Sequence, residues 1–447
     1  MLEESLGNKE EGIKNYEKAI KINPRYEDPI ARLVNIYFEN SNFLQAKSFS
    51  RMLVTLNPHN EDYLSICGRI EQELKNDKAA IDLFNKARRI NPANEEALLG
   101  LGSIYFNHKD FIQAKKYYTT LVATSPANKT YYSDLGYIEN ELQNKNAAIT
   151  HYKKALKIDP NYDDALLLLA EVYFDKGDFV NAKKCYATLL KIDPLNENIH
   201  TDIGLIEERL GNIGKATIHY KKALDVNPES QVALEGLGGI YFDGEDLRLA
   251  KKYYTKLLSL NGKNSSYYTN LGYIESELKN KVVALSHYKH ALKIDPECEP
   301  ALSGLAKIYF ATKKTQKAKE CFTTLISIDA RNENYYNDMG VIEEELKNFE
   351  AAILNYKKAL KLSPRSELVL RNLVNVYTVT KEYQKAKETS KSLISINPGK
   401  SEYFYNLGLA EEKLNNKKEA QMNYKKVLKL NPGHKQAKKK LKLIGKK

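Results

Sequence analysis

The sequence predicts an all-α fold built from tandem pairs of antiparallel helices. Prolines recur at one fixed interval, as at Pro24, Pro58 and Pro92, and the series continues to Pro432 with Gly262 and Ala330 in two of these places. The interval is about 34 residues, and periods of about 20–50 residues are typical of repeat proteins, in which each repeat is one supersecondary motif. An alanine stands at the twentieth position of every whole repeat, from Ala46 to Ala420.

Residues 163–196 show why each repeat is expected to be a helix pair. The first apolar stripe, spaced three or four positions apart, consists of Leu166, Leu169, Ala170 and Tyr173. The second stripe consists of Ala182, Cys185, Tyr186, Leu189 and Leu190. Such spacing indicates amphipathic helices. Gly177 lies between the stripes, and Pro194 disfavours helical geometry in the residue before it, so both mark helix ends.

A small residue at the eighth position of most repeats indicates where the two helices come closest. It is Gly102, Gly136, Ala170, Gly204, Gly238, Gly272, Ala306, Gly340 or Gly408. Glycine in a helix interior costs about 1 kcal/mol relative to alanine. Its repeated use at one position therefore predicts close backbone approach at that point.

These features resemble the tetratricopeptide repeat family, with its Leu-Gly pair, alanine, aromatic residue and proline at fixed places in each repeat. The resemblance covers twelve whole repeats at residues 27–434. Part of a repeat precedes them at residues 1–26, starting inside a first helix, and a basic capping helix and tail follow at residues 435–447. The chain has no Trp, and Leu64, Leu98, Tyr132 and Phe404 stand at the family's tryptophan position. The resemblance implies a right-handed superhelix (an α-solenoid) whose first helices line a concave groove.

The repeats alternate between two kinds, so the true period is a block of two repeats. Tyrosine repeats, which begin at residues 27, 95, 163, 231, 299 and 367, carry Tyr at the eleventh position, followed in the first five by Phe. Glutamate repeats, which begin at residues 61, 129, 197, 265, 333 and 401, carry Glu at that position and Asn at the interhelix turn. This alternation explains why residues 135–160 and 271–296 are nearly identical.

The recurring glutamates lie on the apolar stripe of their own helices, where a charged side chain needs a partner. The set is Glu3, Glu71, Glu139, Glu207, Glu275, Glu343 and Glu411. A buried carboxylate is tolerated only when it is paired and hydrogen-bonded. We expect each to bind a Tyr hydroxyl or a Lys of an adjacent repeat, and the alternative is a groove that recognises cations. The turn asparagines are interpreted as residues that tolerate left-handed backbone.

Charge is distributed unevenly along the chain. The net charge is +12, but the C-terminal stretch from Pro432 to Lys447 holds seven lysines and no acid. At the second, fifth, ninth, twelfth and thirteenth positions, which face the groove in the family, there are seventeen acids and five bases. Phosphate backbones are bound by Lys and Arg, so an RNA-binding solenoid is disfavoured. The tail is interpreted as a solvated cap, or alternatively as a segment drawn to an anionic surface.

We therefore expect a groove that binds protein or peptide ligands of basic or mixed charge. Its expected residues are Phe38, Glu39, Phe106, Asp134, Glu141, Phe174, Asp175, Asp202, Phe242, Asp243, Asn270, Glu277, Phe310, Asp338, Glu345 and Asn406. The aromatic residues would act as anchors, since such side chains commonly dominate binding energy. The alternative is that these acids only keep a solvated surface soluble.

One patch departs from the acidic trend and resembles the sites with which some relatives hold a C-terminal carboxylate. Arg371, Asn375, Asn406 and Lys440 occupy four of the five corresponding places, and Gln436 replaces the expected lysine at the fifth. Charge-assisted hydrogen bonds to a carboxylate are strong. A carboxylate clamp near the C-terminal end is thus a lesser hypothesis.

No sequence motif argues for catalysis, a cofactor or a metal. The four cysteines are widely spaced, which disfavours a disulfide framework or zinc site and favours a reducing compartment, so we expect a cytoplasmic protein. His151, His219 and His287 occupy one repeat position and are interpreted as surface members of a copied helix. The expected function is a non-enzymatic interaction scaffold. The alternative is the substrate-recognition region of a larger enzyme, such as a tetratricopeptide-bearing glycosyltransferase.

Overall fold

A computed structural model describes residues 9–444, and within this range the chain forms 26 helices and no strand. Contacts divide the chain into two compact units, residues 1–233 and 234–447. The helices of the first unit are α2 (Lys9–Ile22), α3 (Glu27–Glu39), α4 (Phe43–Leu56), α5 (Glu61–Glu73), α6 (Asp77–Ile90), α7 (Glu95–Asn107), α8 (Phe111–Thr124), α9 (Lys129–Glu141), α10 (Lys145–Ile158), α11 (Asp163–Asp175), α12 (Phe179–Ile192), α13 (Glu197–Arg209) and α14 (Ile213–Val226).

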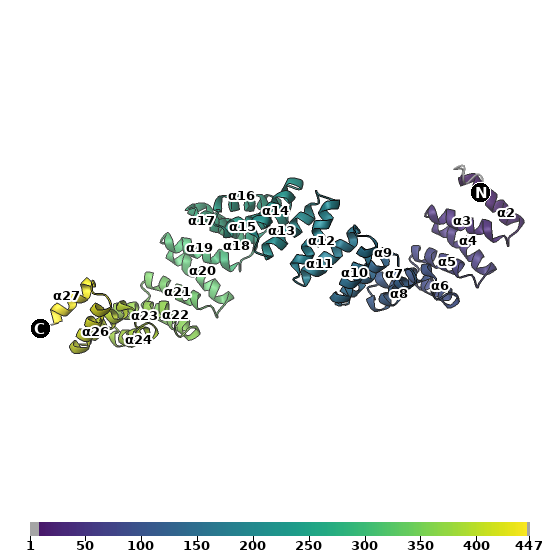
Figure 1. Ribbon diagram of the computed structural model, residues 1–447. Helices are drawn as coiled ribbons and strands as arrows, with labels where there is room; N and C mark the ends of the chain where they lie inside the picture. The colour runs from purple at the N-terminus through teal and green to yellow at the C-terminus, as the bar shows by residue number, and fades with distance from the viewer. Residues whose placement is uncertain (1–8, 445–447) are drawn as a thin grey trace. The chain divides into compact units, whose positions relative to one another are not determined.

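Helix α15 (Gln231–Asp243) begins at the end of the first unit. The second unit continues with α16 (Leu247–Leu260), α17 (Ser265–Glu277), α18 (Lys281–Ile294), α19 (Glu299–Ala311), α20 (Thr315–Ile328), α21 (Glu333–Glu345), α22 (Phe349–Leu362), α23 (Glu367–Val379), α24 (Tyr383–Ile396), α25 (Ser401–Lys413), α26 (Lys417–Leu430) and α27 (Lys435–Ile444). Within each unit, consecutive helices pack as antiparallel pairs that stack on their neighbours (Figure 1). The all-α solenoid of helix pairs is therefore confirmed.

The predicted helix pair in residues 163–196 is α11 and α12, joined by a short turn at Lys176, Gly177 and Asp178. Gly177 has a φ of +74° at this turn, the left-handed backbone that glycine adopts without steric cost. Asp178 then caps α12, because its side chain accepts a hydrogen bond from the backbone N–H of Asn181. Local sequence signals thus set both ends of the turn.

The turn asparagines of the glutamate repeats have a different role from the one that the sequence predicts. The left-handed residue is the one before the asparagine, with a φ of 60° at Lys75 and 63° at Gln143. Asn76 itself has a φ of −102°, and its side-chain amide donates to Glu71. The expectation of a purely conformational role was wrong, because the amide is used as a hydrogen-bond donor.

The eighth-position glycines make room for an aromatic ring of their own repeat. A Cβ added at Gly136 would lie 2.7 Å from Cε1 of Tyr152, whose side chain from α10 is completely buried. The same clash would occur at Gly204 with Tyr220, where the distance is 2.6 Å. The prediction of close backbone approach at this position was wrong, because the atoms that approach the glycine belong to a tyrosine ring.

The two ends of the described chain are helical. The predicted partial repeat at residues 1–26 is described from α2 onward. Its first eight residues, including Glu3, lie outside the described range. Helix α27 packs on the last repeat, with Ala437 fully buried in one cluster with Tyr424 and Val427. Residues 445–447 of the predicted basic tail also lie outside the described range.

Substitution of Gly136 by Ala is expected to destabilise the chain, because the added methyl group would force the buried Tyr152 ring to move. Overpacking of this kind costs about 1–3 kcal/mol. Gly214→Ala in α14 is the matched control, since a Cβ there meets nothing within 4 Å. Urea unfolding followed by circular dichroism should show a lower midpoint for Gly136→Ala and an unchanged or higher midpoint for Gly214→Ala. Equal midpoints for the two variants would contradict this account.

Candidate functional site

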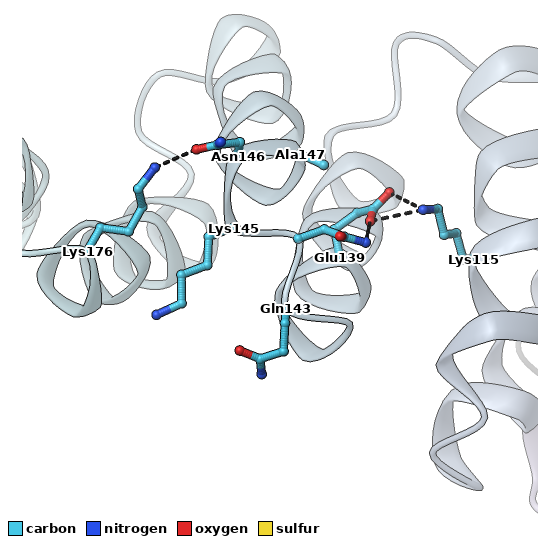
Figure 2. A pocket seen from close by; sticks show the side chains of 8 residues that line it. Lys115, Glu139, Gln143, Lys145, Asn146, Ala147 and Lys176 are labelled. Atoms are coloured by element: carbon cyan, nitrogen blue, oxygen red, sulfur yellow. Dashed lines mark hydrogen bonds and ion pairs between the residues drawn. The ribbon is translucent and has the colours of Figure 1, made fainter.

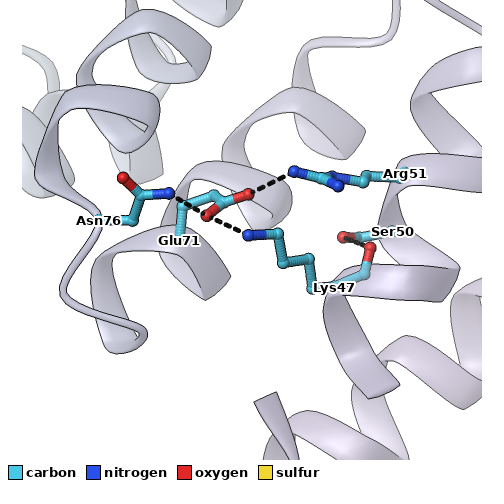
Figure 3. A network of polar contacts seen from close by, with 5 residues as sticks. All are labelled: Lys47, Ser50, Arg51, Glu71 and Asn76. Carbon is cyan, nitrogen blue, oxygen red and sulfur yellow. Dashed lines mark hydrogen bonds and ion pairs between the residues drawn. The ribbon is translucent and has the colours of Figure 1, made fainter. Parts of the chain in front are cut away.

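Each glutamate repeat is joined to the tyrosine repeat before it by a buried carboxylate. Glu71 in α5 is 1% exposed and binds Lys47 of α4 at 2.8 Å and Arg51 at 3.3 Å. Asn76, from the turn that follows α5, donates to the same carboxylate at 2.9 Å. Figure 3 shows the three donors converging on Glu71 from two repeats. We call the lysine, glutamate and asparagine of each such group a junction.

The junction recurs once in every block of two repeats in the described chain. Glu139 binds Lys115 at 2.9 Å and Asn144 at 2.9 Å (Figure 2). The equivalent lysine–glutamate pairs are Lys183–Glu207, Lys251–Glu275, Lys319–Glu343 and Lys387–Glu411, at 2.6–3.1 Å. Asn212, Asn280, Asn348 and Asn416 complete them. The prediction that these glutamates form structural pairs with a lysine of the adjacent repeat is confirmed.

Ionisation of the junction glutamates reflects their donors. Burial raises the pKa of Glu71, but the hydrogen bonds from Lys47 and Asn76 and the nearby positive charges outweigh it, so the pKa lies below its ordinary value. The pKa values of Glu207 and Glu275 are lowered by the same balance. A lowered carboxyl pKa contributes stability above the unfolded value, and that stability is lost as the pH falls through the folded value.

The phenylalanines predicted for the groove are half-buried, and four of the five pack against other rings. Phe106 lies 5.9 Å from Phe111, measured between ring centroids, and 5.3 Å from Tyr137 of the next glutamate repeat. Phe38 and Phe174 make equivalent contacts with the first residue of their second helices, and Phe310 is also half-buried. Each ring therefore presents one part to solvent, while another part holds the helix pair together.

The acids and asparagines predicted for the groove fall into two groups. Those at the thirteenth position are exposed: Glu39, Glu141, Asp175, Asp243, Glu277 and Glu345. Two of them form ion pairs within the chain, Asp175 with Lys145 at 3.2 Å and Glu345 with Lys313 at 2.8 Å, and Glu39 also has a partner. The other group, at the sixth position, is half-buried: Asp134, Asp202, Asn270, Asp338 and Asn406.

The sixth-position group is engaged mainly by the chain itself. The Tyr118 hydroxyl lies close to Asp134 and the Tyr186 hydroxyl lies close to Asp202, and each lowers the pKa of that carboxyl. Burial is the larger effect and, together with the charge of Asp164, raises the pKa of Asp134 to about 6. Asn270 lies close to Tyr254 and lowers the pKa of its hydroxyl, the effect of an amide N–H on a phenol oxygen, and Asn337 donates to Asp338 at 3.2 Å.

Two groove cavities bring predicted site residues together. In the first unit, Phe38 and Glu39 line a cavity of about 490 Å³, and the guanidinium of Arg69 lies 4.5 Å from the Phe38 ring centroid. In the second unit, Phe242, Asn270 and Glu277 line a cavity of about 350 Å³. The larger cavity of about 660 Å³ in Figure 2 lies at the helix turns, where Lys115, Lys145 and Lys176 are already bound to partners.

The four residues of the hypothetical carboxylate clamp are not equally available. Arg371 and Asn375 are exposed on α23, and Asn406 is half-buried on α25. Lys440 of α27 binds Glu412 at 2.9 Å, and that carboxylate also accepts from Tyr424 at 2.7 Å. The lysine charge is therefore balanced within the chain, which weakens the clamp hypothesis.

Aromatic residues at the ninth position lie beside predicted groove residues but were not in the predicted set. Tyr273 is 47% exposed, and its ring centroid lies 5.2 Å from that of Phe242. Tyr137 occupies the same place beside Phe106. The signal was present in the two copies of the sequence Leu-Gly-Tyr, at positions 135–137 and 271–273. The prediction from the groove positions was based on charged side chains, so it did not include these two tyrosines.

The histidines of the copied helix are half-buried rather than on the surface. His151 stacks on Tyr132, and His287 packs on Tyr268, each at the family's tryptophan position. His219 lies against His200, with 3.2 Å between their Nδ1 atoms. Burial lowers the pKa of all three copies. The prediction of surface histidines was only half right, because one side of each ring packs on the residue at the family's tryptophan position. Residues 9–444 contain no cluster of three metal-ligating side chains.

Stacked helix pairs with an exposed face of first helices define the class of helical-repeat solenoid proteins. The chain belongs to the tetratricopeptide repeat family. Three profiles with that description match, one at residues 1–26, 198–230, 233–264, 265–298, 333–366 and 401–434, another at 143–201 and 282–338, and the third at 99–163. Together these matches cover more than half of the chain.

Curated relatives match in part. The chain is 22% identical over 253 residues to "BBSome complex member BBS4" of Bos taurus, covering 54% of the chain and 49% of the relative. It is 26% identical over 111 residues to "Small glutamine-rich tetratricopeptide repeat-containing protein 2" of Mycosarcoma maydis, covering 25% and 32%. The chain thus spans about half and a third of these relatives' lengths.

Solved structures are similar at low identity. "Structure of Naa15/Naa10 bound to HypK-THB" matches with a TM-score of 0.45 and 17% identity, covering 93% of this chain and 65% of that one. "Crystal structure of YrrB: a TPR protein with an unusual peptide-binding site" matches with a TM-score of 0.39 and 20% identity, covering 42% and 97%. Among the described helices, none is long and apolar enough to cross a membrane.

Substitution of Glu139 by Gln is expected to destabilise the junction between α8 and α9, because Lys115 loses its charged partner. Hydrogen bonds to charged groups are worth about 1.5–3 kcal/mol. The control is Asp175→Asn, which removes the ion pair between Asp175 and Lys145. Both side chains are partly exposed, so the loss in unfolding free energy should be less than about 1 kcal/mol. Hydrogen exchange at α8 and α9 should speed up for Glu139→Gln alone, and similar exchange in both variants would count against the junction.

Substitution of Asp134 by Asn is expected to stabilise the chain at pH 7. The folded pKa of about 6 exceeds the ordinary value of 3.8, so ionised Asp134 opposes folding. The stability that its protonated form contributes is present below pH 4 and lost as the pH rises through 6, a difference of up to about 3 kcal/mol. Asn keeps an acceptor oxygen beside the Tyr118 hydroxyl. Urea midpoints should be higher for the variant at pH 7 and equal at pH 4, and a lower midpoint at pH 7 would refute this.

Proposed function

We propose that this chain is a protein–protein interaction scaffold whose groove holds extended polypeptide segments of basic or mixed charge. Membership of the tetratricopeptide repeat family supports the interaction role. The name of the YrrB structure describes a peptide-binding site in that protein, and the same kind of use is proposed for this chain. No metal or cofactor enters the proposal, and no catalytic group is assigned.

The observation that carries the proposal is the composition of the groove cavities. Each combines a half-buried phenylalanine with exposed carboxylates from first helices, as with Phe38 and Glu39 in one unit and Phe242 and Glu277 in the other. An aromatic surface beside fixed negative charge suits an extended segment that carries Lys or Arg next to the residue held in the cavity. The exposed carboxylates Glu141, Asp243 and Glu277 would set the charge preference.

Charge removal at the groove tests this preference. The triple variant Glu141→Gln, Asp243→Asn and Glu277→Gln is expected to bind basic peptides about tenfold more weakly at low salt, since exposed ion pairs contribute about 0.2–1 kcal/mol each. Its matched control changes three exposed acids outside the groove positions, Glu229, Glu320 and Glu350, to Gln. The measurement is fluorescence anisotropy with labelled peptides of one length whose net charge is stepped from acidic to basic.

The two triple variants have the same net charge, so a difference between them locates the binding surface. Equal loss in both would mean that the peptides respond only to overall charge. Tighter binding of acidic peptides by the unmodified chain would contradict the proposed partner chemistry. Phe-to-Ala changes in the groove are less informative, because rings such as Phe106 also hold the helix pairs together.

A further inference from the structure

The groove cavity of the second unit lies across three successive first helices. Phe242 of α15, Asn270, Tyr273 and Glu277 of α17, and Lys307 of α19 contribute to its walls. Tyr288, from the second helix α18, also lines it. With a volume of about 350 Å³, the cavity has room for one long side chain of a bound polypeptide.

A register-equivalent cavity of about 390 Å³ is present in the first unit. Its lining includes Glu73, Phe84 and Gly100, which stand at the same repeat positions as Glu277, Tyr288 and Gly304, three blocks earlier in the chain. The recurrence shows that the repeat pattern builds this cavity. The two copies differ at their floor, which is Phe84 in one and Tyr288 in the other.

Two glycines allow the floor ring to reach the groove. A Cβ at Gly304 would lie 2.3 Å from Cζ of Tyr288 and 2.6 Å from its hydroxyl oxygen, and a Cβ at Gly272 would lie 2.7 Å from the same ring. The tyrosine therefore passes between the two glycines, with its hydroxyl end beneath Gly304. In the first unit Tyr152 stands at the repeat position of Tyr288, but Leu168 replaces the glycine that corresponds to Gly304. The Tyr152 hydroxyl is buried and has no hydrogen-bond partner among the described residues.

The hydroxyl of Tyr288 is left without an internal partner by a local change of sequence. In three other glutamate repeats the same hydroxyl donates to a glutamate at the twelfth position. The pairs are Tyr220–Glu208 at 2.9 Å, Tyr356–Glu344 at 2.6 Å and Tyr424–Glu412 at 2.7 Å. Ser276 replaces that glutamate here, and within residues 9–444 the Tyr288 hydroxyl makes no hydrogen bond. The side chain is nevertheless only 3% exposed.

We propose that this cavity binds an amide side chain, glutamine or asparagine, of an extended partner polypeptide. The inference rests on the proposed function of the groove. The Tyr288 hydroxyl would donate to the amide oxygen, and Glu277 would accept from the amide nitrogen. The methylene groups would lie against the rings of Phe242 and Tyr273, whose centroids are 5.2 Å apart.

The charges around the cavity favour a neutral occupant with both donor and acceptor groups. Glu277 and Lys307 both line it, so an anionic or a cationic side chain would meet one like charge. An apolar side chain would cover the Tyr288 hydroxyl without giving it a partner, and a buried polar group without a hydrogen bond is unfavourable. The cavity over Phe84 has no hydroxyl to satisfy and carries no such preference.

The test uses the full chain and a series of labelled peptides that differ only at one guest position, occupied by Gln, Leu, Glu or Lys. The unmodified chain is expected to bind the Gln peptide most tightly. Tyr288→Phe removes only the hydroxyl, and Ser276→Glu supplies the partner found in three other repeats. Each variant should weaken binding of the Gln peptide about tenfold and leave the Leu peptide unchanged.

Tyr356→Phe is the matched control, because that hydroxyl already donates to Glu344. It should leave the preference for Gln intact, and circular dichroism should show that all variants are folded. If peptides bind but Gln has no advantage, or if Tyr288→Phe changes nothing, the amide pocket is wrong and the groove function stands. If no peptide of the series binds, both are overturned.

Discussion

The lysine–glutamate–asparagine junction is the constraint on which the packing of these repeats depends. Each glutamate lies on the apolar stripe of a first helix, with Glu71 only 1% exposed. A buried carboxylate without partners would oppose folding strongly. Its lysine comes from the preceding repeat and its asparagine from the following turn. The carboxylate is therefore satisfied only when two neighbouring repeats are docked in one register.

This arrangement leaves the exposed sides of the first helices free for other uses. Lysines such as Lys47 and Lys115 lie on second helices and form ion pairs with the junction glutamates. The acids Glu141, Asp243 and Glu277 are exposed on first helices and form no ion pair within residues 9–444. The opposite charges are thus separated between helix faces by the same residues that hold the solenoid together. The acidic, partly aromatic groove proposed above would follow from the way the repeats are joined.

Much of the fold could be predicted from the sequence, because the regular spacing of the repeats places most helix ends at a turn that contains proline, glycine or asparagine. The lysine partner of each glutamate was also predictable, since a buried carboxylate requires a cation. Three features were not. The asparagine amide, the ring above each glycine and the free hydroxyl of Tyr288 depend on side-chain rotamers. Sequence spacing carries no information about rotamers, and for the same reason the engagement of Lys440 by Glu412 was missed.

The location of both junction charges within one block of two repeats has a consequence for how such a chain can change length. Lys47 and Glu71 belong to the same block, as do Lys115 and Glu139. A gene duplication or loss of one whole block would carry a complete set of partners with it. Insertion or loss of a single repeat would place a junction glutamate against a repeat that lacks the lysine, or leave a junction lysine without its glutamate. We therefore expect such a chain to gain or lose repeats two at a time.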